Sequence, residues 1–314
     1  MKKIAIQGVP GSYHDIAAHK FFKNEEIELI CCNTFEEVFD TLKKDSSIIG
    51  MIAIENTIAG SLLHNYELLR DSGATIIGEH KLRISHSIMC LPGEDWSTLT
   101  EVNSHPVALA QCRDFLQHHP QLKVVETEDT AGSARDIKKK GLKGHAAICS
   151  KYAAELYGMK ILQEGIETNK HNFTRFLVIC DPWMADELKD RSKINKANIV
   201  FSLPHNEGSL SQVLSIFSFY HINLTKIQSL PIIGRGLGYR EGNDRAGIRG
   251  LRRRGADLEA GRAGMTMKGS NSEEFGIWPF LVGADGGYLF GRLLTRRRIW
   301  PESATIPLRS GKTI

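Results

Sequence analysis

Residues 48–69 read IIGMIAIENTIAGSLLHNYELL, and this stretch decides the fold. It begins as an apolar run of strand length, turns polar at residues 55–57, and resumes at residues 62–69 with apolar side chains at helical spacing. Such a pattern is typical of a buried strand, a loop and a helix. The stretch therefore predicts a strand–loop–helix unit in which the helix begins where the strand ends.

Three further copies of this unit follow the same design. Alternating strands and helices predict α/β layers with parallel strands, and ligands of such sheets bind beyond the carboxyl ends of the strands. The expected strands lie at residues 3–6, 102–103 and 124–129, and the expected helices open after Ser12 and at residues 109–116 and 130–140.

Each loop leads to a helix N-terminus, where free backbone N–H groups and the helix dipole favour an anion. The loops supply Ser, Thr, Asn and Gln rather than catalytic acids. The simpler alternative is that each Ser or Thr caps its own helix. Convergence of all four loops on one cleft would instead create a site for a small anion.

Two later stretches are suited to cross between two halves of the structure. Residues 79–90 alternate like a long strand, and residues 165–176 lead back. Two crossings predict two lobes with a cleft between them, the layout of periplasmic-type binding proteins. The returning stretch ends in HNFTRF at residues 171–176, which places the Thr174 hydroxyl and the Arg175 guanidinium between two aromatic rings. A strand end with both side chains facing solvent is the alternative.

Composition narrows the class of protein further. The chain has 314 residues, 41% hydrophobic and 24% charged, as in ordinary soluble proteins. No apolar run is long enough for a secretory signal or a membrane span, so we expect a cytoplasmic protein. Six cysteines without CxxC spacing and twelve histidines without HExxH imply neither a disulfide framework nor a zinc site. The turn at residues 8–11 lacks the GxGxxG dinucleotide fingerprint.

Five short motifs occur in a fixed order along the chain. They read GVPGSY at residues 8–13, IENT at 54–57, SHP at 104–106, AAICS at 146–150 and NFTRF at 172–176. In number and order they closely resemble bacterial prephenate dehydratase over residues 1 to about 233. The resemblance implies a two-lobed, type II binding-protein-like catalytic domain over residues 1–182. The implied reaction is the decarboxylative dehydration of prephenate to phenylpyruvate, without metal or organic cofactor.

The resemblance also implies roles for individual residues. Thr174 resembles the essential threonine of the family and would hydrogen-bond or protonate the leaving hydroxyl. Arg175 would pair a substrate carboxylate or form a structural ion pair between the lobes. The family positions that line the cleft correspond to Glu55, Asn56, Ser104 and Gln111, and Phe173 would exclude water.

A regulatory ACT domain, which in this family binds phenylalanine at a dimer interface, is matched only in part. Residues 197–233 supply a strand, a helix and a second strand, the first half of such an α+β domain. Gly208 and Leu210 match one phenylalanine-binding motif. In the second motif, Gln228 and Leu230 replace two charged residues of the family pattern. These changes are expected to weaken the binding of phenylalanine.

Residues 234–314 differ in composition from the rest of the chain. Before residue 234 there are 19 Lys and 6 Arg, and after it 2 Lys and 13 Arg; glycine rises from 13 in 233 residues to 16 in 81. The change indicates a reading-frame change or a gene fusion, so we expect this tail not to supply the missing strands and helix. A nucleic-acid-binding tail is disfavoured, because few aromatic residues lie near the arginines.

The sequence thus predicts a prephenate dehydratase, a carbon–oxygen lyase of phenylalanine biosynthesis, with impaired phenylalanine feedback and a weakened homodimer. Arogenate dehydratase is the near alternative, because its substrate differs only by an amino group on the side chain. A cytosolic sensor that binds a small anion or amino acid without turnover is the alternative from another class. No nucleic-acid or membrane partner is expected.

Overall fold

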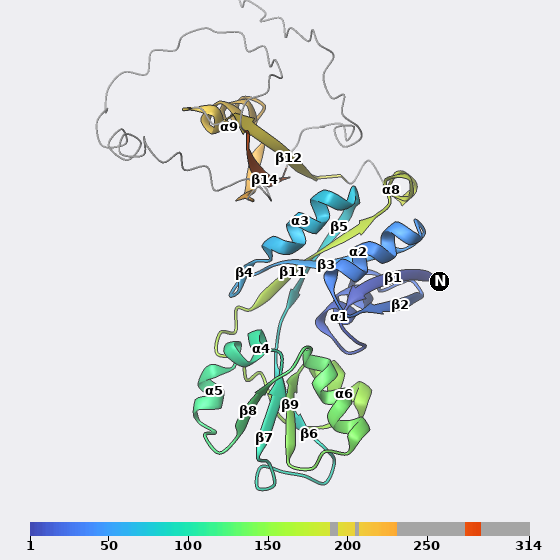
Figure 1. Cartoon of the computed structure of the whole chain (residues 1–314), viewed down its shortest axis with the longest axis vertical. Coiled ribbons are helices and arrows are strands. Elements are labelled where there is room, and N and C mark those ends of the chain that lie inside the picture. Colours follow the sequence, from blue (N-terminus) through green and yellow to red (C-terminus); the bar gives the residue numbers. More distant parts are fainter. Residues whose placement is uncertain (189–193, 205–206, 231–273, 284–314) are drawn as a thin grey trace, which may run out of the picture. The chain divides into compact units, whose positions relative to one another are not determined.

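The computed structural model describes residues 1–188, 194–204, 207–230 and 274–283. The chain divides into two compact units, Met1–Lys193 and Ile194–Ile314. The first unit contains two sheets, which define lobe 1 and lobe 2, and the chain passes between them twice (Figure 1). Within the described segments, no helix combines the length and the apolar character needed to cross a membrane.

Lobe 1 is built from both ends of the first unit. Its elements are β1 (Lys2–Gln7), α1 (Tyr13–Phe21), β2 (Ile27–Cys32), α2 (Phe35–Lys44), β3 (Ile49–Asn56), β4 (Gly60–Ser61), α3 (Leu63–Ser72), β5 (Thr75–Arg83), β11 (Phe173–Cys180) and α8 (Pro182–Leu188). The sheet order is β2-β1-β3-β11-β5, with β4 paired to β3. The first three strands are parallel, and β11 returns antiparallel between β3 and β5. This return places Thr174 opposite Asn56.

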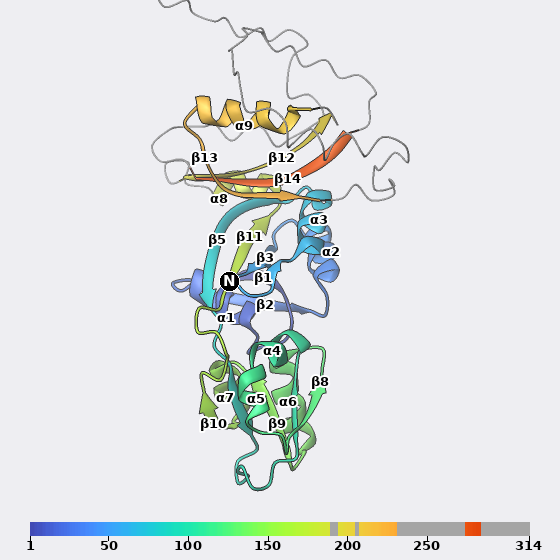
Figure 2. The same cartoon turned by 90° about the vertical axis from the view of Figure 1, so that its left-hand side faces the viewer.

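Lobe 2 repeats the same plan with the middle of the chain. Its elements are β6 (Ser87–Cys90), β7 (Glu101–Ser104), α4 (Pro106–Gln111), α5 (Arg113–Gln117), β8 (Lys123–Glu126), α6 (Thr130–Lys140), β9 (His145–Cys149), α7 (Lys151–Tyr157) and β10 (Lys160–Glu164). The sheet order is β10-β6-β9-β7-β8, in which β6 is the antiparallel strand. Figure 2 labels β8, β9 and β10 of this sheet together with the helices α4, α5, α6 and α7 of the same lobe. Both lobes are thus mixed α/β layers, which confirms the predicted fold class of this unit.

The central strand β9 of lobe 2 is buried on both faces. Along β9, Ala146 and Ile148 pack on one side with Leu109 of α4, whereas Ala147 and Cys149 pack on the other side with α6 and α7. Successive strand residues point to opposite faces, so a continuous apolar run is needed where both faces are covered. This explains why residues 146–149 read as an unbroken hydrophobic segment.

The structure differs from the predicted elements at three places. The long strand expected at residues 79–90 is divided, because β5 ends at Arg83 and β6 begins at Ser87. The helix expected at residues 109–116 is interrupted at Cys112, because the Thr168 backbone N–H donates to the Gln111 carbonyl and the Thr168 hydroxyl accepts from the Asp114 N–H. Those two groups would otherwise bond within one helix. The polar linker expected at residues 183–197 instead begins with α8.

The second unit contains β12 (Lys196–Pro204), α9 (Ser209–Phe219), β13 (Asn223–Ser229) and β14 (Glu274–Gly283). The strand, helix and strand lie where residues 197–233 predicted them. Gly208 adopts a φ of 81° immediately before α9, Leu210 lies exposed on α9, and the Gln228 amide donates to the Ser229 carbonyl.

The tail was expected to add no strand, and β14 corrects that expectation. It lies between β12 and β13 and pairs antiparallel with both. Its sequence, EFGIWPFLVG, is rich in aromatic and branched residues that favour strands, a local pattern that the overall Gly and Arg content of the tail obscured. The rest of residues 234–314 lies outside the described residues.

Candidate active site

Thr174 and Asn56 meet where β11 and β3 pair at the edge of lobe 1. The Asn56 side-chain N–H group donates to Thr174 Oγ1 over 2.9 Å and to Asn172 Oδ1 over 2.8 Å. Asn172 is fully buried, and Asn56 and Thr174 are nearly so. Buried polar groups need partners, so these contacts hold the three side chains in place.

The orientation of the Asn56 amide is fixed by the backbone. Its Oδ1 accepts hydrogen bonds from the backbone N–H groups of Ile58 at 2.9 Å and Ala59 at 2.8 Å. If the Asn56 amide were flipped, its NH2 group would face these two backbone N–H donors and neither could form a hydrogen bond. The Asn56 oxygen must therefore face Ile58 and Ala59. The Asn56 NH2 group therefore has to face Asn172 and Thr174 as a donor.

The orientation of the Asn56 amide determines the direction of the hydrogen bonds that lead from Asn56 into lobe 2. Because Asn172 Oδ1 accepts from Asn56, Asn172 Nδ2 is a donor, and it lies 2.8 Å from Gln111 Oε1. The same Gln111 oxygen lies 2.9 Å from His86 Nε2, which must then carry a hydrogen. Gln111 Nε2 closes the ring by donating to Asn56 Oδ1 over 3.4 Å. The amides of both lobes thus form one directional network.

His86 and Tyr13 are the last two members of this hydrogen-bond network, after Gln111. Burial lowers the pKa of His86, while its hydrogen bond to Gln111 and the charge of Glu167 act in the opposite direction. A neutral imidazole with hydrogen on Nε2 accepts at Nδ1, where the Tyr13 hydroxyl lies at 2.8 Å. Burial, together with Cys149, Cys112 and Glu167, raises the pKa of Tyr13 well above its ordinary value, so the phenol keeps its proton.

The network leaves Thr174 as a hydrogen-bond donor. Its oxygen accepts from Asn56, and no atom of the described residues accepts its hydroxyl hydrogen. A hydroxyl whose oxygen is already occupied by a donor can direct its hydrogen toward a ligand. The site therefore presents a positioned hydrogen-bond donor at Thr174.

Glu55 and Arg175 lie on the other face of the same strands. Arg175 contacts Glu55 Oε2 at 2.8 Å and Glu79 Oε2 at 3.8 Å, and its guanidinium lies 3.4 Å from the Tyr66 hydroxyl. Strand alternation turns Phe173 to this face too, where Lys81 lies 4.4 Å from the ring centroid. The structure therefore does not bring Glu55, Phe173 or Arg175 together with Thr174, and the ion pairs are within lobe 1.

We expect Arg175→Met to lower the free energy of unfolding by roughly 1–3 kcal/mol, because it removes the Arg175 charge that contacts Glu55 and Glu79. The turnover number should change by less than about threefold, and Arg175→Lys should recover part of the stability. Urea unfolding and steady-state kinetics on the same preparations test this. A large rise in KM with unchanged stability would return Arg175 to the substrate site.

Ser104 is also held away from the amide network. Its hydroxyl donates to the Ile148 carbonyl of β9 over 2.5 Å, and the side chain is fully buried. At the helix N-termini, Ser12 caps α1 and Asp129 caps α6. The capping alternative is thus confirmed for Ser12, while at α6 the cap is Asp129.

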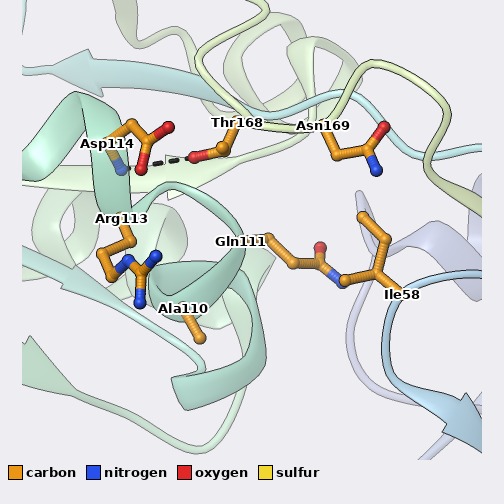
Figure 3. A pocket seen from close by; sticks show the side chains of 7 residues that line it. All are labelled: Ile58, Ala110, Gln111, Arg113, Asp114, Thr168 and Asn169. Atoms are coloured by element: carbon orange, nitrogen blue, oxygen red, sulfur yellow. Dashed lines mark hydrogen bonds between the residues drawn. The ribbon is translucent and has the colours of Figure 1, made fainter.

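A pocket of about 150 Å³ adjoins the amide network at Gln111. Figure 3 shows Gln111 extending toward Ile58, with Arg113 on the side of α5. Arg113 is exposed and makes no ion pair with the described residues. The pocket is completed by Ala110, Asp114, Thr168 and Asn169. It combines a cation with amide groups, which suits a carboxylate.

His14 gives lobe 1 a pH-dependent stability. Burial lowers its pKa from 6.5 to about 3, and its Nε2 accepts from the Ala53 N–H at 3.2 Å. Between pH 6.5 and about pH 3 only the unfolded chain binds this proton. The free energy of unfolding therefore decreases as the pH is lowered, by up to about 1.4 kcal/mol per pH unit. The lowered pKa of His86 acts with the same sign.

We therefore expect His14→Gln to reduce this acid sensitivity, because an amide can accept from Ala53 but does not titrate. Between pH 7.5 and 5.0, urea unfolding should show the wild type losing about 2 kcal/mol more than the variant. Equal losses in both proteins would show that His14 is not held neutral by burial.

No group of three His, Cys, Asp or Glu side chains in the described residues is arranged to hold a metal ion. None of the six cysteines forms a disulfide bond. The functional groups gathered at the interface of the lobes are amides, hydroxyls and one neutral imidazole. The fold and this site define a two-lobed α/β protein with a directed hydrogen-bond network where its lobes meet.

Residues 4–182, more than half of the chain, match the family described as prephenate dehydratase. The chain belongs to the prephenate dehydratase family. A relative named arogenate dehydratase 1, from Petunia hybrida, is 39% identical over 231 residues, which is 73% of this chain and 53% of the relative. The chain thus spans about half the length of that curated relative.

Two solved structures share the fold. The prephenate dehydratase of Arthrobacter aurescens in complex with L-Phe superposes with a TM-score of 0.69 and 21% identity, covering 90% of this chain and 80% of that one. A protein described as GqqA, a quorum quenching acylase, superposes with a TM-score of 0.67 and 24% identity, covering 90% and 87%. At these identities the likeness shows the fold alone.

Sequence reasoning did not assign Tyr13, His86 and Arg113 to the site, and it included Asn172 only as part of the stretch at residues 171–176. Tyr13 and Asn172 stand inside two of the quoted motifs, so their positions were available as a signal. His86 stands in the expected crossing stretch, where a single histidine in an apolar alternation gave no indication of its partners. Arg113 follows Gln111 on what was expected to be one continuous helix.

Proposed function

We propose that this chain is a prephenate dehydratase, which converts prephenate to phenylpyruvate by losing carbon dioxide and the ring hydroxyl. Aromatisation of the ring supplies the driving force, so the enzyme has to orient the substrate and stabilise the departing oxygen. The observation that carries the proposal is the Thr174 hydroxyl, which is held as a donor by Asn56.

In this mechanism, Thr174 donates to the leaving hydroxyl as the C–O bond breaks. Threonine is a weak acid, so its contribution is a hydrogen bond that strengthens as negative charge develops on the oxygen. The electron pair of the C–CO2 bond enters the ring while the C–O pair leaves with the hydroxide. Asn56, Asn172 and Gln111 fix the direction of the donor and cost no reorganisation during the reaction.

A substrate carboxylate would bind in the pocket beside Gln111, where Arg113 supplies the positive charge. Glu55 and Arg175 then have a structural role in lobe 1, and Phe173 covers the same face. Ser104 supports the sheet of lobe 2 beneath the site. These assignments follow from the partners that each side chain has in the structure.

The test of this function is an absorbance assay for phenylpyruvate, with prephenate and arogenate offered to the full chain in parallel. We expect higher kcat/KM with prephenate. Preference for arogenate, the substrate after which the Petunia hybrida relative is named, would assign the alternative. Absence of turnover with both would favour a binding or sensing protein, which has no need of a donor at Thr174.

Regulation is proposed to be impaired. The second unit supplies β12, α9 and β13 in the order of an ACT domain, and β14 takes a place in its sheet. Gln228 and Leu230 stand where the family pattern has charged residues. L-phenylalanine is the proposed effector, since a phenylalanine complex is known for a fold relative, and a weakened homodimer is the proposed assembly. The cytoplasmic location remains a prediction of the sequence.

We expect phenylalanine to inhibit the full chain only weakly, because an effector must bind one state more tightly than another. Dose–response curves should therefore stay nearly flat into the millimolar range, and Gln228→Glu with Leu230→Arg should increase the inhibition. Strong inhibition of the unmodified chain would show that its second unit forms a working effector site.

A further inference from the structure

Tyr13 and His86 join the two lobes at the end of the amide network. Tyr13 is the first residue of α1 in lobe 1, and His86 lies in the segment that passes from β5 to β6. The Tyr13 hydroxyl is 2.8 Å from His86 Nδ1, and the two rings meet edge to face with centroids 5.4 Å apart. His86 is 2% exposed, so this contact is shielded from water.

The Tyr13 hydroxyl has a choice between two acceptors. It lies 2.9 Å from the Ser85 carbonyl and 2.8 Å from His86 Nδ1, but it has only one hydrogen to give. If that hydrogen went to Ser85, a neutral His86 would bond to the phenol oxygen through Nδ1–H. Its Nε2 would then present a lone pair to Gln111 Oε1 at 2.9 Å, which is repulsive.

Gln111 cannot turn to relieve that conflict. Its Oε1 is required as the acceptor for Asn172 Nδ2, and Asn172 is oriented by Asn56. Asn56 is in turn fixed by two backbone N–H groups. Burial lowers the pKa of His86 and so favours its neutral form. With His86 neutral, the arrangement is consistent only when Tyr13 donates to His86 Nδ1 and His86 carries its hydrogen on Nε2.

We propose that Tyr13 and His86 are positioning residues, through which contact between the lobes fixes the hydrogen-bond donor at Thr174. Tyr13 donates to Nδ1 and selects the Nε2–H tautomer of His86, which holds Gln111, Asn172 and Asn56 in the orientation that leaves the Thr174 hydrogen free. Separation of the lobes removes this selection. The inference deepens the proposed function and rests on it for its effect on turnover.

A second contact between the lobes provides a matched control. The Tyr157 hydroxyl of α7 donates to the Pro10 carbonyl over 2.5 Å, and among the described residues it has no hydrogen bond to a member of the amide network. If Tyr13 merely tied the lobes together, Tyr157→Phe and Tyr13→Phe would have similar effects. If Tyr13 selects a tautomer, the two variants separate.

The test begins with 15N NMR of histidine-labelled full chain without substrate, because ring nitrogen shifts distinguish the two neutral tautomers. We expect His86 as Nε2–H and His14, whose Nε2 accepts from Ala53, as Nδ1–H. Tyr13→Phe should move the His86 signals toward a mixture and leave those of His14 unchanged. A His86 that is Nδ1–H or charged in the wild type overturns the proposal.

Kinetics on the same proteins complete the test. Tyr13→Phe should lower kcat about tenfold or more with KM changed less than about threefold, whereas Tyr157→Phe should stay within twofold of wild type. His86→Gln offers a side-chain donor that needs no tautomer selection, so adding Tyr13→Phe to it should cost little more. Additive losses, or a full-activity Tyr13→Phe protein, contradict the inference.

The two measurements separate this inference from the proposed function. If the wild type does not turn over prephenate, the proposed function fails, and the link between Tyr13 and turnover fails with it. The NMR result still decides whether Tyr13 selects the His86 tautomer.

Discussion

Thr174→Val is expected to lower the turnover of prephenate by about a hundredfold or more while the protein remains folded. The substitution keeps the branched shape on β11 and removes the hydroxyl that Asn56 orients. Loss of one positioned donor typically costs this much when the donor acts on developing charge. The KM should change little, because the effect arises in the transition state.

Thr174→Ser is the matched control, because it retains the hydroxyl and should keep part of the activity. Circular dichroism and thermal unfolding should show both variants folded. A Thr174→Val enzyme within twofold of wild type would remove the hydroxyl from the mechanism.

Asn56→Asp is expected to lower the turnover number as much as Thr174→Val does, although it leaves the Thr174 hydroxyl in place. One carboxylate oxygen would still accept from the N–H groups of Ile58 and Ala59. The other would replace the NH2 group and accept the hydroxyl hydrogen of Thr174, so that hydrogen would no longer be free for the substrate. The new oxygen would also face Asn172 Oδ1, which disturbs the network further.

The turnover number of the Asn56→Asp variant should therefore fall by about a hundredfold or more. Asn24→Asp, an exposed substitution that adds the same charge, is the control and should be neutral. If Asn56→Asp retained most of the activity, the direction of hydrogen bonding at Thr174 would not matter to the reaction.

Local patterns were sufficient for many of the elements. Residues 130–140 and α6 coincide, because a polar start, a Lys-rich last turn and Gly141 define both ends of the helix. The two crossings were also visible as long segments between repeated units. What these patterns could not supply was the antiparallel insertion of β11 and β6, which depends on strands far apart in the chain.

In the candidate site, too, some features could be predicted from the sequence and others could not. Thr174, Asn56 and Gln111 were identified from the family resemblance, and the structure brings all three into one network. Glu55 and Arg175 stood beside them in the same motifs, but adjacent residues on a strand point to opposite faces, and a bulge follows Arg175. Whether a side chain faces the cleft therefore depends on register, which the sequence alone does not specify.

Tyr13 and His86 illustrate a further limit. Their importance lies in which atom donates to which, and that follows from a chain of contacts that begins at the backbone of residues 58 and 59. A hydrogen-bond direction is a property of the whole network and not of any one residue. No spacing rule could have identified it.

A crystal structure of the Thr174→Val protein with prephenate bound would show whether residue 174 faces the leaving hydroxyl. We expect the ring hydroxyl of the substrate about 3 Å from the place of the missing Thr174 oxygen, with a carboxylate beside Gln111 and Arg113. Prephenate bound elsewhere, or with its ring hydroxyl turned away from residue 174, would show that Thr174 does not donate to the leaving group.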